Sequence, residues 1–408
     1  APSLNCPDQN AANPLPIMGL CSSTTNDLPP PPNRIRPPGP VGQGSSKYGP
    51  YRKNASSGQW CLRTTTEDTT CPPSFDTEKQ LKEWLLRHIT VAHQQSQSIV
   101  RRPGSVAGAQ FIISDCDDCD IYVLDHTSTV SVDRCTNCRI YLGPCDSSTF
   151  IRDCNDCTFV LATRQLRTRN CKNNDMLLFC GTEPVIEKTK KLRLGCFTSA
   201  YFEIQKHFDL CALSIYHNRW TSVHDFTPGK GGGQKNWSLL KQGTTGIDLG
   251  MAPMEGMQFD GQIVPSTFPS DGTTTALPPQ TVVFAPTARG LLKGEEFLQG
   301  LARLEGPSRL IDCKHQAMLP EAWHSIPSNK ELSRVLRAAC IVRPGGGKDD
   351  SKDVSLLPRT LVVNYEAFEP GERPSWVSEI VCADGTSEHW GALHSNDQSW
   401  FEQWGLAV

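Results

Sequence analysis

A repeat between residues 101 and 200 constrains the fold of this chain more than any other feature. Its four units begin around Cys116, Cys135, Cys154 and Cys171 and read "DCDDCDIYVLD", "DRCTNCRIYLGP", "RDCNDCTFVLAT" and "RNCKNNDMLLFC". In each unit a short polar segment precedes an apolar, β-rich run. A nearly constant period of roughly 20 residues, made of strands and tight turns, is typical of a parallel β-helix, whose coils bury their inner faces only by stacking. The sequence therefore predicts a mainly β fold, with a β-helix over residues 101–240.

The paired cysteines of the repeat are candidates for a metal site or for the core. The spacing Cys116-x-x-Cys119, fifteen residues, Cys135-x-x-Cys138 falls within the range of four-cysteine zinc sites. Three facts argue against zinc: the strands repeat in register with the cysteines, the fourth unit has Asn174 in place of its second cysteine, and six thiols do not divide into four-ligand sites. No basic neighbour regularly accompanies the pairs, as a reactive thiolate would require. We therefore expect a ladder of thiols that pack as small apolar side chains, and no metal.

The parts of the chain outside the repeat differ from it in composition. Residues 1–56 are rich in proline, serine and asparagine, which predicts a disordered arm. Residues 57–100 form an N-terminal extension with an amphipathic helix over 76–95, and residues 241–280 have the composition of a linker. In residues 281–408, the C-terminal domain, strands and helices alternate, which predicts a small α/β domain. We expect its strands at 281–286, 309–313 and 360–368 and its helices at 291–304 and 329–340.

Charge and local motifs exclude several classes of function. The formal net charge is −3, so no basic field argues for nucleic acid as a partner. No apolar run reaches the roughly 18 residues of a transmembrane helix, and the first residues lack the layout of a secretion signal, which favours a cytoplasmic location. The glycine-rich segments at 229–235 and 343–351 lack the G-x-x-x-x-G-K-[ST] order of a phosphate-binding loop. We therefore expect no nucleotide site and no cofactor of the chain's own.

Arginines crowd the third repeat unit, in "TRQLRTRN" at residues 163–170. If this segment is a strand, Gln165, Arg167 and Arg169 share one face and Leu166 shares the other. Because Leu166 belongs in the core, the other three side chains point outward. Glu187 follows one coil later, where it can lie beside Arg167 or beside Arg169. Such a contact is either a surface salt bridge, which stabilises by under about 1 kcal/mol, or a support that holds an arginine for insertion into a partner's phosphate site.

Residues 101–240 resemble the tubulin-cofactor-C family. The resemblance rests on "RRPGSVAGAQFIISDCDDCDIYVLDHTSTVSVDRCTNCRIYLGP", "RQLRTRNC", "TEPVIE", "LRLGCF", "WTSVHDFTPG" and "NWSLL". It implies a right-handed parallel β-helix and an enzyme activator rather than an enzyme, namely a GTPase-activating protein for an Arf-like small GTPase in ciliary protein trafficking. The partner would hold the GTP and the magnesium ion. Three alternatives stay open: a cofactor C-type protein of tubulin folding or microtubules, a scaffold that binds a GTPase without accelerating it, and a scaffold stabilised by zinc.

The same resemblance implies roles for the site residues. Arg167 matches the family's catalytic arginine finger, and Gln165 lies just before it in the same motif. Glu187 matches the acidic residue that supports the arginine and the interface. Phe226, in "HDFTP", matches an aromatic residue of the GTPase contact surface, and Arg169 completes the motif as a structural, partner-binding residue. The chemistry is consistent with these roles, because an arginine supplied in trans can raise the rate of phosphoryl transfer by about 10³ to 10⁵.

The two ends of the chain match the family weakly or not at all. The sequence begins with Ala-Pro and offers no glycine for myristoylation, so either the chain is trimmed or it is not attached to a membrane by that route. Cys6 and Cys21 are candidates for palmitoylation, although one lipid chain anchors weakly. The implied location is the cytoplasm, at the cilium base or basal body or on the cytoskeleton. The C-terminal domain stands where a family member carries a ferredoxin-like, nucleoside-diphosphate-kinase-like domain. We expect it to be non-catalytic, with His394 as an exposed loop residue.

Overall fold

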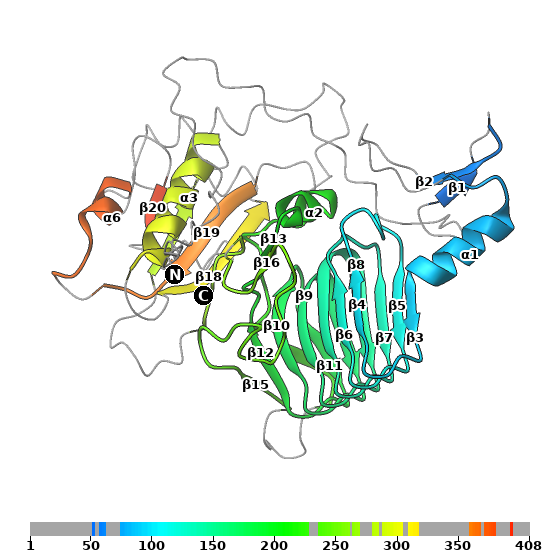
Figure 1. Cartoon of the computed structure of the whole chain (residues 1–408). Coiled ribbons are helices and arrows are strands. Elements are labelled where there is room, and N and C mark those ends of the chain that lie inside the picture. Colours follow the sequence, from blue (N-terminus) through cyan, green and yellow to red (C-terminus); the bar gives the residue numbers. More distant parts are fainter. Residues whose placement is uncertain are drawn as a thin grey trace, which may run out of the picture. The chain divides into compact units, whose positions relative to one another are not determined.

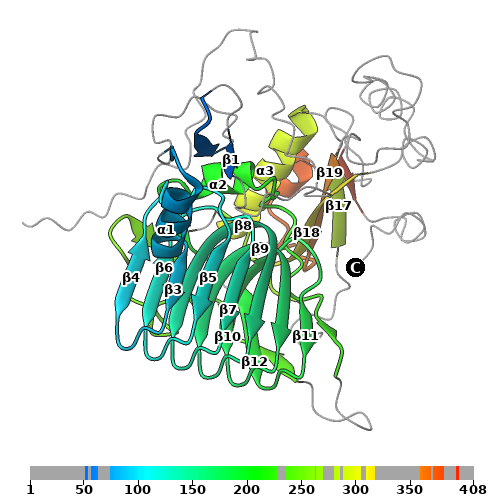
Figure 2. The same cartoon turned by 90° about the vertical axis from the view of Figure 1, so that its right-hand side faces the viewer.

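The computed structural model describes residues 51–53, 57–62, 74–227, 236–261, 263–269, 280–284, 288–304, 309–317, 359–368, 371–380 and 392–394 (Figure 1). Its main feature is a 12-stranded parallel arrangement in which the chain winds through two ladders of strands. Figure 2 shows the strands of successive coils side by side. The parallel β-helix predicted from the repeat is therefore confirmed. It begins one coil earlier than residue 101, because the first strands lie at 90–92 and 98–101.

Each coil contributes one strand to each ladder. The first ladder consists of β3 (Thr90–Ala92), β5 (Phe111–Ser114), β7 (Val130–Asp133), the second halves of β8 (Arg139–Arg152) and β9 (Thr158–Arg169), β11 (Val185–Glu187) and β14 (His224–Asp225). The second ladder consists of β4 (Ser98–Arg101), β6 (Asp120–Val123), the first halves of β8 and β9, β10 (Asp175–Cys180), β12 (Leu192–Cys196) and β15 (Trp237–Leu239).

The corners between the two ladders explain the cysteine pattern. The residue before each paired cysteine has a positive φ, for example 55° at Asp115 and 51° at Asp118, and aspartate and asparagine tolerate this left-handed conformation. The thiols of Cys116 and Cys119 each donate to a carbonyl oxygen two residues earlier, at 3.3 Å. The repeat's cysteines are buried and free, so the predicted ladder of thiols in the core is confirmed. Within the described residues, no cysteine belongs to a group of three or more side chains with metal-ligand atoms within 4.8 Å of one another.

The two ladders differ in how many of their faces are buried. Burial alternates along β5 and β7 of the first ladder, so one face of that ladder meets solvent. Burial is nearly continuous along β6 and β10 of the second ladder, because buried side chains between Phe197 and Leu213 and between Leu240 and Val264 cover its outer face with a second core. This cover includes β13 (Ala200–Tyr201), α2 (Ile204–Leu210) and β16 (Met257–Gln258).

The predicted linker at 241–280 is therefore wrong over its first part. Met251, Met257, Phe259 and Val264 are buried in the second core, and the Tyr122 hydroxyl donates to the carbonyl oxygen of Ala252 at 2.7 Å. The glycine and proline content that suggests a linker instead allows an irregular segment to follow the outer face of the β-helix. Residues 270–279 lie outside the described part of the chain.

The N-terminal extension also departs from its predicted limits. The helix α1 spans Glu78–His88 rather than 76–95, since β-branched residues after His88 enter β3. Thr77 and Gln80 exchange backbone-to-side-chain hydrogen bonds of 3.2 and 3.3 Å at its start, which is the geometry of a capping box. The predicted arm ends earlier than residue 56, because β1 (Tyr51–Lys53) pairs with β2 (Trp60–Leu62). Residues 1–50 lie outside the described residues.

The described residues of the C-terminal domain contain a four-stranded antiparallel sheet of order β18-β19-β17-β20. Its elements are β17 (Gln280–Phe284), α3 (Ala288–Ala302), β18 (Leu310–Ala317), β19 (Arg359–Tyr365), α6 (Ser375–Ile380) and β20 (Ala392–His394). His394 is thus a strand residue that pairs with Val282, and the prediction of a loop position is wrong. The predicted helix at 329–340 lies outside the described residues, and the ferredoxin-like fold stays a prediction. None of the helices described is both long and apolar enough to span a bilayer.

Candidate functional site

The solvent-facing side of the first ladder carries the predicted site residues. Leu166 and Thr168 are buried at 0% and 2% exposure, whereas Arg167 and Arg169 are exposed and Gln165 is half-buried. The predicted division of this strand into an inner and an outer face is therefore confirmed. Because β9, β11 and β14 are adjacent in the ladder, their outward side chains form one continuous surface, which we call the β9–β11–β14 face.

Strand register arranges this face in two rows. In the first row, Arg167 of β9 lies between Phe150 of β8 and Val185 of β11, and His224 of β14 follows Val185. In the second row, Arg169 lies between Arg152 and Glu187, and Phe226 follows at the end of β14, where its N–H donates to the carbonyl oxygen of Ile186 at 2.9 Å. Neighbouring strands are about 4.8 Å apart, so three arginines, one carboxylate and three aromatic rings share one small area.

The register settles which arginine Glu187 accompanies. Of the two alternatives that the sequence left open, the structure places Glu187 opposite Arg169, with 3.8 Å between Oε1 and Nε. The side chains of Arg169 and Glu187 are 62% and 41% exposed, so water screens the pair and its contribution to folding stability is small, under about 1 kcal/mol. The pairing places the Glu187 carboxylate beside Arg169 rather than beside Arg167.

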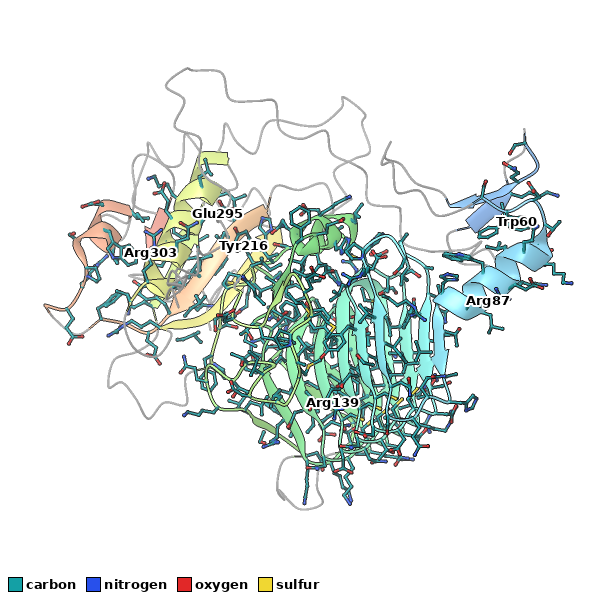
Figure 3. The ribbon with its side chains drawn as sticks, in the orientation of Figure 1. Trp60, Arg87, Arg139, Tyr216, Glu295 and Arg303 are labelled. Carbon is teal, nitrogen blue, oxygen red and sulfur yellow. The ribbon has the colours of Figure 1, made fainter. Side chains whose placement is uncertain are left out.

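Among the residues that the structure describes, Arg167 differs from most arginines of the β-helix in having no carboxylate beside it. The guanidinium groups of Arg134, Arg152 and Arg193 are each held by an aspartate one coil away, at distances of 2.5–2.8 Å, and Arg139, labelled in Figure 3, is bound to Asp120. With the residues that the structure describes, Arg167 makes no ion pair or hydrogen bond. Its row neighbours Phe150 and Val185 are apolar. The result is a positive charge at a fixed backbone position, which no group in the described part of the chain neutralises.

The remaining predicted residues also lie on this face. The amide oxygen of Gln165 accepts a hydrogen bond from the Ser148 hydroxyl at 3.0 Å, which orients the glutamine two residues before Arg167. Phe226 is 63% exposed and meets the ring of His224 edge to face, with 4.5 Å between centroids. An exposed, oriented phenyl ring beside charged groups is typical of a protein-binding surface.

Arg164, the first arginine of the cluster, has a structural role instead. Its guanidinium donates to the backbone oxygen of Asp146 at 2.5 Å, to the Asp146 carboxylate at 3.0 Å and to the backbone oxygen of Cys211 at 2.6 Å. It thereby ties β9 to the end of α2.

Sequence reasoning missed Phe150 and His224 as parts of the face. The repeat would have identified Phe150, because it stands one coil before Arg167 at the equivalent position of the preceding unit. His224 stands two residues before Phe226, so strand alternation puts it on the same side.

Comparisons with known proteins match the same part of the chain. Residues 108–226 match the family model "Tubulin binding cofactor C". The chain is 51% identical over 148 residues to Protein XRP2 of Homo sapiens, covering 36% of this chain and 42% of that protein. It is 49% identical over 154 residues to Protein XRP2 of Danio rerio, covering 38% and 40%. It is 30% identical over 139 residues to Tubulin-folding cofactor C of Arabidopsis thaliana, covering 34% and 40%.

One solved structure, "Tubulin Binding Cofactor C from Leishmania major", matches 28% of this chain and 80% of its own at 23% identity, with a TM-score of 0.26. The matched region spans less than half the length of the curated relatives, 40% and 42% of the two XRP2 proteins. The family model nevertheless contains every predicted residue of the β9–β11–β14 face, from Gln165 to Phe226. The similarity to the tubulin binding cofactor C family thus covers residues 108–226 of the β-helix, and with them the β9–β11–β14 face.

Proposed function

We propose that this chain is a GTPase-activating protein for an Arf-like small GTPase, with Arg167 as an arginine finger supplied in trans. Gln165, Arg169, Glu187 and Phe226 would hold the finger and bind the partner. The nucleotide and the magnesium ion would belong to the GTPase, and the activator would contribute no nucleotide site. The ciliary setting and the cytoplasmic location implied by the family resemblance are part of this proposal.

The observation that carries the proposal is that Arg167 has no ion-pair partner among the residues that the structure describes. An exposed arginine within reach of a carboxylate is already neutralised, and moving it to a phosphate would first require that contact to break. Among the described residues, Arg167 has apolar neighbours in its row and an adjacent ion pair that occupies Glu187. Its guanidinium therefore keeps its charge and its five N–H donors for an anion outside the chain.

The chemistry requires such a group. As the γ-phosphoryl group transfers to water, negative charge develops on its oxygens, and an arginine in trans stabilises that charge without proton transfer. The stacked coils support Arg167 on both sides, through parallel pairing of β9 with β8 and β11. This rigidity matters because catalytic groups must be held within about 0.5 Å of their productive positions.

Single-turnover hydrolysis tests the proposal. GTP-loaded Arf-like GTPases and, in parallel, tubulin would be mixed with the full chain, and release of phosphate would be followed with time. We expect the chain to accelerate hydrolysis by an Arf-like protein by about 10³-fold or more. Acceleration of tubulin GTP hydrolysis instead would favour the cofactor C-type alternative, which is supported by the name of the Arabidopsis relative. Binding to the GTP form without acceleration of either would identify a scaffold.

Phe226 provides a test of the binding surface that is independent of the chemical step. Because its ring is largely exposed, Phe226→Ala should leave folding stability within about 0.5 kcal/mol, yet weaken binding of the GTPase by about 2 kcal/mol, or roughly 30-fold. Titration calorimetry with the GTPase loaded with a non-hydrolysable GTP analogue measures this. The matched control is Phe202→Ala, since Phe202 is 92% exposed and stands beyond the β9–β11–β14 face. Equal losses of affinity in both variants would mean that the GTPase binds another part of the chain.

A further inference from the structure

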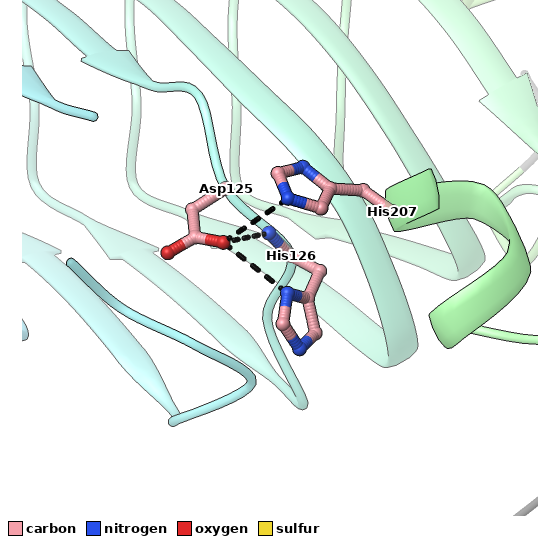
Figure 4. Close-up of side chains that lie close together, drawn as sticks. All are labelled: Asp125, His126 and His207. Atoms are coloured by element: carbon pink, nitrogen blue, oxygen red, sulfur yellow. Dashed lines mark hydrogen bonds and ion pairs between the residues drawn. The ribbon is translucent and has the colours of Figure 1, made fainter. Parts of the chain in front are cut away.

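A cluster of one carboxylate and two imidazoles lies outside the β9–β11–β14 face. Asp125 and His126 follow β6, and His207 lies on α2; Figure 4 draws both histidines interacting with one oxygen of Asp125. Asp125 Oδ1 is 3.2 Å from Nδ1 of His126 and 3.5 Å from Nε2 of His207. All three ligand atoms lie within 4.8 Å of one another. Neither the β-helix core nor the proposed GTPase surface uses this group.

The carboxylate of Asp125 is fixed in position and buried. Its side chain is 1% exposed, that of His207 is 3% exposed and that of His126 is 22% exposed. Asp125 Oδ2 accepts hydrogen bonds from the backbone N–H groups of Val106 and Ala107, both at 2.8 Å. These bonds direct Oδ1 toward the two rings. A buried carboxylate is costly unless cations or donors surround it. Here Oδ1 accepts a hydrogen bond from the backbone N–H of His126 at 2.8 Å and also faces two ring nitrogens that can share a cation.

We propose that Asp125, His126 and His207 form a site for a divalent transition-metal ion, with zinc as the expected occupant. A tetrahedral zinc ion with bonds of about 2.0–2.1 Å separates its ligand atoms by about 3.3 Å. The two distances from Asp125 Oδ1, 3.2 and 3.5 Å, are close to that separation. Imidazole nitrogens and a carboxylate oxygen are ligands that suit zinc. The proposal departs from the expectation of no metal, which concerned the cysteines.

The surroundings orient His207 as a ligand. Its Nδ1 is 2.6 Å from the hydroxyl oxygen of Tyr201, so the ring can donate to that oxygen and keep the lone pair of Nε2 toward Asp125. Hydrogen-bonded support of this kind is the usual partner of a metal-bound histidine. Tyr201 is held in turn against Gly143, where an added Cβ would lie 2.7 Å from its hydroxyl oxygen.

A fourth donor is also at hand. Oε2 of Glu203 lies 3.7 Å from Nε2 of His207, and its side chain is 32% exposed. Glu203 or a water that it orients can complete the four ligands of a structural site. A bound ion would join α2 to the segment after β6. Because it would bind only the folded chain, it would stabilise the packing of α2 over the second ladder.

Zinc titration of the full chain after removal of metal by chelation tests this proposal. We expect the thermal midpoint to rise with added Zn²⁺ and not with the same concentration of Mg²⁺. His126→Gln should lower the affinity for Zn²⁺ by at least about 100-fold. The matched control is His93→Asn, which removes an exposed histidine outside the cluster and suits the left-handed φ of 54° at that position. It should bind as the wild type does.

Cobalt distinguishes this site from the thiols. Co²⁺ bound by Asp125, His126 and His207 should give the visible absorption of a tetrahedral ion without the near-ultraviolet band of thiolate ligands. A thiolate band that persists in His126→Gln would overturn the proposal, and so would an unchanged thermal midpoint with Zn²⁺. His126 is the ligand chosen for substitution because it is partly exposed; should that variant unfold, the wild-type cobalt spectrum decides alone.

Discussion

Replacing Arg167 with alanine is expected to lower the stimulated rate of GTP hydrolysis by at least about 100-fold, equivalent to about 2.7 kcal/mol of transition-state stabilisation. The reason is that no other described group on the β9–β11–β14 face is a free cation: Arg169 is paired with Glu187 and Arg152 with Asp133. The measurement is single-turnover phosphate release at an activator concentration that saturates the GTPase. Saturation ensures that any loss reports the chemical step rather than binding.

Two further variants separate the geometry of the guanidinium from its charge. Arg167→Lys keeps the positive charge but loses the planar fork that contacts two phosphate oxygens, so it should recover only a small part of the activity. Arg193→Ala is the matched control, because Arg193 is also an exposed strand arginine but lies in the second ladder and is paired with Asp175. It should accelerate hydrolysis as the wild type does. Full stimulation by Arg167→Ala would remove Arg167 from the mechanism.

The affinity of the Arg167→Ala variant for the GTPase shows whether Arg167 acts in binding or in the chemical step. Its affinity for the GTP-bound partner should fall far less than its rate, since Phe226 and the Arg169–Glu187 pair remain. If affinity and rate fell together, Arg167 would be a binding residue and the chain a scaffold. If the wild type also bound without accelerating hydrolysis, the scaffold alternative would hold irrespective of Arg167.

The repeat was enough to predict the β-helix, because each unit shows the same small corner residues and the same apolar run. It was also enough to predict which arginines face outward, since Leu166 must be inside. The partner of Glu187 was harder to infer, because both Arg167 and Arg169 precede it by about one coil. In this part of the β-helix, paired residues of adjacent coils have the same sequence separation as Val185 and Arg167. Glu187 and Arg169 have that separation too, so the separation alone would have selected Arg169 as the partner of Glu187.

Other features depend on contacts that no local pattern contains. Met251 and Phe259 are scattered among glycines and prolines, and their burial follows from the apolar outer face of the second ladder, where Tyr122 and Tyr141 require a cover. The Asp125–His126–His207 cluster has the same origin. Its third member stands several coils further along the chain than the other two, and only the packing of α2 brings it to the loop after β6.

The second large effect is expected at Asn174, where the fourth repeat unit departs from the cysteine pattern. Asn174 is fully buried; its Oδ1 accepts from the N–H of Cys157 at 2.8 Å, and its Nδ2 donates to the carbonyl oxygen of Cys154 at 3.1 Å. Asn174→Ala would leave that N–H without its acceptor and open a cavity. We expect the free energy of unfolding to fall by about 2–4 kcal/mol, measured by urea denaturation.

The same corner supplies the controls for Asn174. Asn155, one coil earlier, is a half-buried corner residue, and its backbone pairs with Thr136 on one side and Lys172 on the other. Asn155→Ala should therefore change the free energy of unfolding by no more than about 0.5 kcal/mol. Asn174→Cys should destabilise less than Asn174→Ala, because a thiol fills more of the space and can donate to a carbonyl oxygen as Cys157 does toward Asn155 at 3.2 Å. Equal losses for cysteine and alanine would mean that the amide, rather than the size of the side chain, determines the fit at this corner. If Asn174→Ala lowered the free energy of unfolding no more than Asn155→Ala does, neither the amide nor the size of the side chain at position 174 would be important for stability.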